Sequence, residues 1–180
     1  MPADQLSAKD WLRQGLKTLA RSGFTALKAE PLAKAMGVSR GSFYWHFADV
    51  DAYHAALLKY WREVSAERII ADLEAAPDGA ALPQLFRRAF HAKPPAETAI
   101  RSWAAHNPAV RKAVDAIDTR RMSYIASVLM KSGLPDRTAR ARARVLYWTF
   151  VGFVLMEKPL RQPQQEAVID ELIRFAQAKE

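Results

Sequence analysis

Apolar residues recur at helical spacing in almost every segment of this chain, and turn-forming Gly, Pro and Asn residues separate the segments. No stretch alternates apolar and polar residues over a convincing length, so no strand is predicted. The pattern predicts helices over 8–22, 29–36, 40–47, 50–75, 82–91, 95–105, 109–131, 137–156 and 164–179. The predicted fold class is therefore all-α.

The segment 29–47 has the pattern of two short helices joined by a tight turn. Leu32 and Met36 lie four residues apart and favour one buried face on the first helix. Gly37 adopts left-handed dihedral angles without strain, so we expect the first helix to end there. Ser39 is a candidate N-cap, because its hydroxyl is able to accept a backbone N–H bond from the second helix.

The second helix of this pair, 40–47, displays residues that a purely structural element does not need. Phe43 and Phe47 are four residues apart and can share its buried face. A short helix that keeps Gly41 suits a DNA groove, because Gly lets the backbone approach closely. Candidate contacts to base edges are Arg40, Ser42 and Tyr44, and candidate contacts to phosphate or sugar are Lys28, Ser39, Trp45 and His46. The alternative is a generic helical hairpin with a glycine turn.

The composition of the chain fits a negatively charged partner. Lys and Arg number 27 against 19 Asp and Glu, which gives a net charge of +8 and a pI near 9.9. Such a balance favours nucleic acid or an anionic membrane surface. The longest apolar run, Val145–Met156, is too short to span a bilayer and predicts a buried helix.

Several kinds of site are excluded or unexpected. The absence of Cys excludes disulfides, thiolate zinc sites and cysteine nucleophiles. No Gly-rich phosphate loop, metalloprotease helix motif or serine elbow occurs, so we expect no catalysis and no cofactor. His91 and His106 lack partners at metal-ligand spacing, so we expect no metal site. Met1–Leu6 is short and polar, without a signal peptide, which predicts a cytoplasmic protein.

The first third of the chain resembles a known family. GVSRGSFYWHF at 37–47, with GFTALKAEPLAKAM before it and ADVDAYHAALLKYW after it, is similar to the helix-turn-helix of TetR-type (tetracycline-repressor-like) transcriptional regulators. The resemblance implies a three-helix DNA-binding head at 1–48 and a helical effector-binding and dimerisation body at 49–180. Two positions depart from the family. Lys28 replaces a usual Thr or Ser cap, and Val50 stands near a position where Lys or Arg commonly contacts phosphate.

The same resemblance implies a dimer interface and an effector cavity in the body. The candidate interface lies on the last two long helices and comprises Val145, Trp148, Val151, Gly152, Leu155 and Leu172. The candidate cavity residues are aromatic or Met, namely Phe86, Phe90, Trp103, Met122 and Trp148. Burial within one chain is the alternative for the interface, and ordinary core packing is the alternative for the cavity residues.

The sequence thus predicts a homodimeric transcriptional regulator, in its simplest form a ligand-responsive repressor. Its predicted partners are double-stranded, pseudo-palindromic operator DNA and an unidentified small-molecule effector, with no membrane partner. One alternative is a ligand-binding or protein-interaction dimer whose DNA head has lost sequence-specific recognition. Another alternative is a protein that binds anionic membranes, and the net charge is the only feature that favours it.

Overall fold

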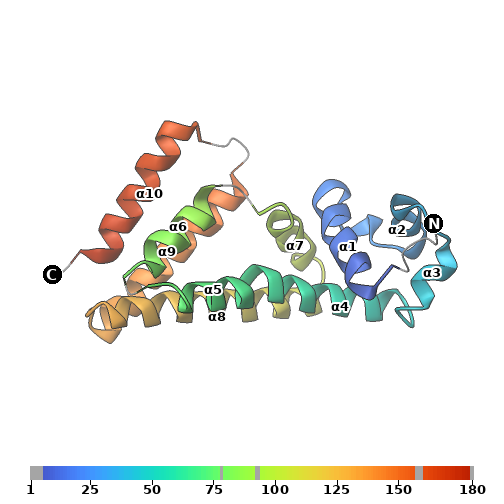
Figure 1. Ribbon diagram of the computed structural model, residues 1–180, viewed down its shortest axis with the longest axis horizontal. Coiled ribbons are helices and arrows are strands. Elements are labelled where there is room, and N and C mark those ends of the chain that lie inside the picture. The colour runs from blue at the N-terminus through green and yellow to red at the C-terminus, as the bar shows by residue number, and fades with distance from the viewer. Residues whose placement is uncertain (1–5, 78, 92–93, 157–159, 179–180) are drawn as a thin grey trace. The chain divides into compact units, whose positions relative to one another are not determined.

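The computed structural model describes residues 6–77, 79–91, 94–156 and 160–178, and every regular element in these ranges is a helix (Figure 1). The elements are α1 (Ala8–Ser22), η1 (Phe24–Ala26), α2 (Ala29–Met36), α3 (Arg40–Tyr44), α4 (Val50–Arg62), η2 (Glu63–Glu67), α5 (Arg68–Glu74), α6 (Ala81–His91), α7 (Glu97–Ala104), α8 (Pro108–Lys131), α9 (Asp136–Leu155) and α10 (Gln162–Gln177). The all-α prediction is confirmed. None of the helices within these ranges is long and apolar enough to cross a bilayer.

The chain divides into two compact units. Residues 1–65 and 95–114 form the first unit, and residues 66–94 and 115–180 form the second. The first unit therefore contains the predicted head together with a segment of the predicted body, which includes α7. The functional boundary between residues 48 and 49 stays a prediction.

An aromatic cluster holds the helices of the first unit together. Its four rings are fully or almost fully buried and belong to Trp11 of α1, Phe43 of α3, Phe47, and Tyr53 of α4. The Phe43 ring centroid lies 5.4 Å from that of Trp11 and 5.1 Å from that of Tyr53. The Tyr53 hydroxyl also donates a hydrogen bond to the Trp11 carbonyl oxygen at 3.1 Å. These contacts fix α3 against α1 and α4.

The second unit has its own hydrophobic core. Helices α6, α9 and α10 and the second half of α8 enclose it, and its largest side chains belong to Phe86, Phe90, Ile125, Leu129, Leu146, Tyr147, Phe150 and Ile169. Helix α10 packs mainly against α6 and presents Ile169 and Ala176 to this core. Val168 and Phe175, next to these residues in the sequence, are exposed to solvent.

Most predicted helix ends match the structure to within two residues, and the differences have local causes. The predicted helix 50–75 is divided by η2, whose five residues have π-helical hydrogen bonding. Asp136 is the first residue of α9, one residue earlier than predicted, and its carboxylate accepts a hydrogen bond from Arg140 Nε at 2.8 Å. The last helix begins earlier than predicted because Pro163 fits its first turn. Its predicted end at 179 and residues 1–5 lie outside the described residues.

Candidate nucleic-acid interface

Helices α2 and α3 meet at the tight turn that the sequence predicts. Gly37 follows α2 with φ 69° and ψ 27°, in the left-handed region that a side chain disfavours. The Val38 N–H then donates to the Ala33 carbonyl at 3.1 Å, which closes the end of α2. Ser39 has extended backbone angles and turns the chain into α3. This geometry is that of a helix-turn-helix, with α3 in the place of the recognition helix.

Helix α3 is shorter than predicted and is held in place by packing. It comprises five residues, Arg40–Tyr44, and hydrogen bonds from His46 and Phe47 to the Phe43 carbonyl add one further turn. A helix of this length has no stability of its own in water. Phe43 is fully buried in the aromatic cluster and therefore anchors the whole segment.

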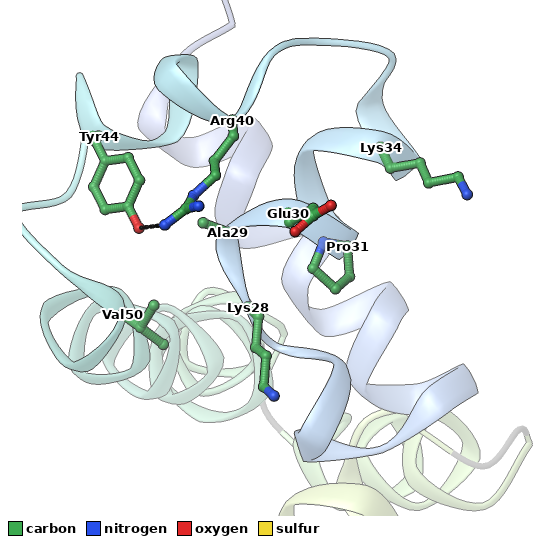
Figure 2. Close-up of a pocket in the computed structure, with 8 residues that line it drawn as sticks. All are labelled: Lys28, Ala29, Glu30, Pro31, Lys34, Arg40, Tyr44 and Val50. Atoms are coloured by element: carbon green, nitrogen blue, oxygen red, sulfur yellow. Dashed lines mark hydrogen bonds between the residues drawn. The ribbon is translucent and has the colours of Figure 1, made fainter.

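An open groove of about 680 Å³ lies beside this helix (Figure 2). Its lining residues come from the start of α2, from α3 and from the start of α4, and they are Lys28, Ala29, Glu30, Pro31, Lys34, Arg40, Tyr44 and Val50. Three of them carry a positive charge and one carries a negative charge. The groove is thus positively charged and open to solvent, which suits contact with a polyanion.

Arg40 is held in place by its neighbour Tyr44 one turn later. The Arg40 Nη2 donates to the Tyr44 hydroxyl at 3.2 Å, and the guanidinium carbon lies 5.6 Å from the Tyr44 ring centroid (Figure 2). This hydrogen bond, together with the nearby Glu30 carboxylate, raises the pKa of Arg40 above its ordinary value. Both side chains are exposed, and an arginine has further N–H donors free to contact a ligand.

The predicted DNA-contacting residues all lie in this part of the first unit. Lys28, Ser39, Arg40, Gly41, Tyr44 and Trp45 are exposed, and Ser42 and His46 are half-buried. Trp45 stands out, because 88% of its surface is exposed although its ring is large and apolar. A Cβ on Gly41 would have only the Ser39 Oγ nearby, at 3.7 Å, so the chain at Gly41 is open to close approach.

One local expectation for these residues changes, and a second is met. Ser39 occupies the N-cap position of α3, but its hydroxyl makes no capping hydrogen bond. Lys28 occupies the N-cap position of α2 without a side-chain cap, because its ammonium group only donates hydrogen bonds and cannot accept one from a backbone N–H. Elsewhere in the first unit, Ser7 and Asp49 do cap their helices, with their side chains accepting from the N–H groups of Asp10 and Ala52.

Two charged residues of the groove, Glu30 and Lys34, were not predicted from the sequence. Both lie on α2, four residues apart, whereas Ala29, Leu32 and Ala33 of the same helix are buried. This alternation was visible in the sequence and places positions 30 and 34 on the outer face of α2.

The predicted cavity residues do not all lie together. Phe86 and Phe90 are buried in the core of the second unit, and Met122 packs against that core. Trp148 is 65% exposed. Trp103 belongs to the first unit, where its ring stacks on Phe24 with centroids 6.1 Å apart.

The residues of the predicted dimer interface fall into two groups. Val145, Trp148 and Leu155 of α9 are 45%, 65% and 52% exposed, and Gly152 is exposed beside them. The other two residues, Val151 and Leu172, are half-buried and pack against the core of the second unit.

The sequence of this part of the chain is similar to that of a known protein family. Residues 12–52 match the model of a family described as bacterial regulatory proteins, tetR family. Among curated proteins, none matches the sequence.

Solved structures extend the likeness over almost the whole chain. A putative TetR-family transcriptional regulator from Rhodococcus sp. has a TM-score of 0.72 at 18% identity, covering 98% of this chain and 100% of its own. A putative transcriptional regulator from Saccharomonospora viridis, in complex with choline, has a TM-score of 0.76 at 16% identity, covering 93% and 95%. The regulator FadR from Bacillus subtilis, in complex with stearoyl-CoA, has a TM-score of 0.66 at 16% identity, covering 96% and 98%.

Proposed function

We propose that this chain, a member of the tetR family of bacterial regulatory proteins, is a ligand-responsive repressor that binds a pseudo-palindromic operator as a dimer. The chain is a regulatory protein and not an enzyme. The observation that carries the proposal is the basic groove beside α3, with Lys28, Lys34 and Arg40 around it. We place its action in the cytoplasm, where such an operator is accessible.

The DNA contacts follow from the chemistry of the exposed side chains. Arg40, at the start of α3, offers paired N–H donors that suit guanine O6 and N7, with Ser42 and Tyr44 as further base contacts. Phosphate and sugar contacts are assigned to Lys28, Ser39, Trp45 and His46, while Gly41 allows close approach of the helix. Lys34 joins the phosphate contacts because it lines the same groove. Most of the affinity then comes from charge, and the sequence preference comes from α3.

The dimer is supported by the exposed apolar side chains of α9. Val145, Trp148 and Leu155 leave large hydrophobic groups in solvent in the single chain. A contiguous apolar surface of this kind favours burial against a partner, and a second copy is the simplest partner. A dimer also places two heads on one DNA molecule, as an operator with two half-sites requires.

The effector is proposed to bind within the second unit. Its core is rich in aromatic side chains, with Phe86, Phe90 and Met122 from the predicted set in contact with it. The complexes of two structural relatives with choline and stearoyl-CoA support a small-molecule effector in a fold of this kind. An effector that prefers one arrangement of the two heads shifts the population toward it. A coupling of about 1–3 kcal/mol changes operator occupancy about 5- to 150-fold.

Selection from random duplex DNA by the purified protein at near-physiological salt tests the proposal. Enrichment of an inverted repeat is the expected result and establishes both sequence recognition and a symmetric dimer. In the same assay, Arg40→Ala should reduce discrimination at one base position per half-site by ~1–3 kcal/mol. A loss that is uniform over all sequences would instead make Arg40 a phosphate contact.

A second candidate function is a ligand-binding or protein-interaction dimer whose head no longer recognises sequence. Val50 favours it, because this apolar residue lines the groove where related heads commonly place a cation. This candidate predicts weak binding that shows no sequence preference and disappears as salt rises. The selection experiment separates the two candidates directly.

A further inference from the structure

The groove beside α3 contains one acidic side chain, Glu30, among three basic ones. Figure 2 shows its carboxylate on the groove side of α2, in the same view as Arg40 and Lys34, with no hydrogen bond drawn to either. Glu30 is exposed and, among the described residues, has no hydrogen bond or ion pair. The Arg40 guanidinium lies close enough for the two charges to interact, yet no side chain in the described ranges occupies the Glu30 carboxylate oxygens.

A carboxylate at this position works against binding to the DNA backbone. Phosphates repel it, and it cancels part of the positive potential that Lys28, Lys34 and Arg40 create. Its place in the first turn of α2 does favour the helix, because an acidic group there interacts well with the helix dipole. That interaction accounts for an acidic residue in the turn, but it leaves the carboxylate free to accept hydrogen bonds from a ligand.

Few groups in a DNA groove are able to form a hydrogen bond with a carboxylate. An ionised carboxylate only accepts hydrogen bonds, so it cannot form one with guanine O6 or N7, which are acceptors as well. The cytosine N4 amino group is a donor in the major groove and pairs with Glu or Asp. Arg40 in the same groove has the opposite preference, for the acceptors of guanine. An arginine and a glutamate side by side thus match the donor and acceptor pattern of G·C pairs.

We propose that Glu30 recognises a cytosine in the operator, in the base pair contacted by Arg40 or in the adjacent one. Its carboxylate accepts a hydrogen bond from the cytosine N4 amino group. The inference rests on the proposed function, since it requires that the groove binds DNA. Glu30 then lowers non-specific affinity and raises selectivity, because every sequence without a cytosine at that position leaves the carboxylate unpaired near phosphate.

The experiment is selection from random duplex DNA at one fixed salt concentration, with the wild-type chain and three variants. Wild type should enrich cytosine at one position in each half-site, by about 5- to 150-fold over other bases. Glu30→Gln should move that preference toward adenine, since a glutamine amide matches adenine N6 and N7. Glu30→Ala should leave the position degenerate. Asp115→Asn removes an exposed carboxylate from α8 and serves as the matched charge control.

The outcomes separate the inference from the proposed function. If wild type and both Glu30 variants enrich the same sequence, Glu30 contacts no base and the inference is wrong, while the operator-binding proposal stands. If wild type enriches no sequence, the proposed function fails and the inference fails with it. Asp115→Asn should keep the wild-type sequence, and a changed sequence in that control would attribute the effect to net charge and overturn the inference. Far-UV circular dichroism of each variant confirms that the exposed substitutions leave the helices intact.

Discussion

Replacing Gly15 with alanine should destabilise the head, although alanine is the better helix former. Gly15 lies on the buried face of α1. A Cβ built at Gly15 would lie 1.9 Å from the Tyr53 hydroxyl oxygen and 3.0 Å from both Leu57 Cδ1 and Tyr53 Cζ. Tyr53 is fully buried and donates its hydroxyl proton to the Trp11 carbonyl, so the ring cannot withdraw without cost.

Three contributions set the size of the effect. Forcing an extra methyl into a packed core costs about 1–3 kcal/mol. Displacing the Tyr53 hydroxyl from Trp11 removes a buried hydrogen bond worth about 1 kcal/mol. The gain in helix propensity from Gly to Ala is about 1 kcal/mol and offsets the second contribution. The expected net loss in the free energy of unfolding is about 1–3 kcal/mol.

Urea unfolding followed by circular dichroism at 222 nm measures this loss, and Tyr53→Phe provides the internal check. The phenylalanine lacks the hydroxyl that makes the closest contact, so the double variant should lose less stability than the two single variants combined. The coupling expected for such neighbours is ~0.5–3 kcal/mol. Gly41→Ala is the matched control, because its Cβ would meet only the Ser39 Oγ, at an ordinary 3.7 Å.

Two results would refute this reasoning. A Gly15→Ala variant as stable as wild type would show that α1 and α4 can move apart at little cost to make room for the methyl group. Such a result would contradict the close packing of these two helices at Gly15. Additive effects in the double variant would show that the loss of stability does not arise from the contact between position 15 and the Tyr53 hydroxyl.

Three further predictions concern caps, pH and assembly. Asp49→Ala should cost ~1 kcal/mol in urea unfolding, because Asp49 caps α4, whereas Ser39→Ala should cost almost nothing, because its hydroxyl caps nothing. Burial raises the pKa of Tyr53, so the folded state resists its ionisation, and stability should fall as pH rises above the ordinary tyrosine value of about 10. Tyr53→Phe should lessen that alkaline loss in pH-dependent thermal melts. Trp148→Glu should convert the proposed dimer to a monomer in sedimentation velocity, and an unchanged dimer would assign the exposed face of α9 another role.

The fold was largely predictable from sequence because its determinants are local. Helical periodicity predicted the helices, and Gly37 marked the end of α2, which the structure confirms. The part that sequence missed depends on tertiary placement. Nothing local distinguishes Trp103, which packs in the first unit, from Phe86, which packs in the second. The attachment of residues 95–114 to the unit that contains the head is likewise a long-range property.

The candidate site likewise has one part that the local sequence predicts and another part that depends on tertiary structure. Arg40 and Tyr44 were predictable because they belong to a contiguous motif, whereas the groove combines α2, α3 and the start of α4. The periodicity of α2 places Glu30 and Lys34 on its outer face, but the groove that this face forms with α3 and α4 is a tertiary property. The missing Ser39 cap was unpredictable as well, since a serine at an N-cap position is able to form a capping hydrogen bond but does not have to.

The aromatic cluster joins the stability of the first unit to the DNA recognition that we propose for it. A five-residue α3 cannot form alone, so the positions of Arg40 and Tyr44 depend on the burial of Phe43 between Trp11 and Tyr53. A substitution that loosens this cluster without touching the groove should therefore weaken operator binding as well as folding. Gly15→Ala is such a change, and its loss of affinity should be shared by all sequences, since it alters the position of the whole recognition helix. Arg40→Ala should instead leave stability unchanged and alter preference at one base position. The two variants thus distinguish a residue that positions the helix from one that contacts the bases.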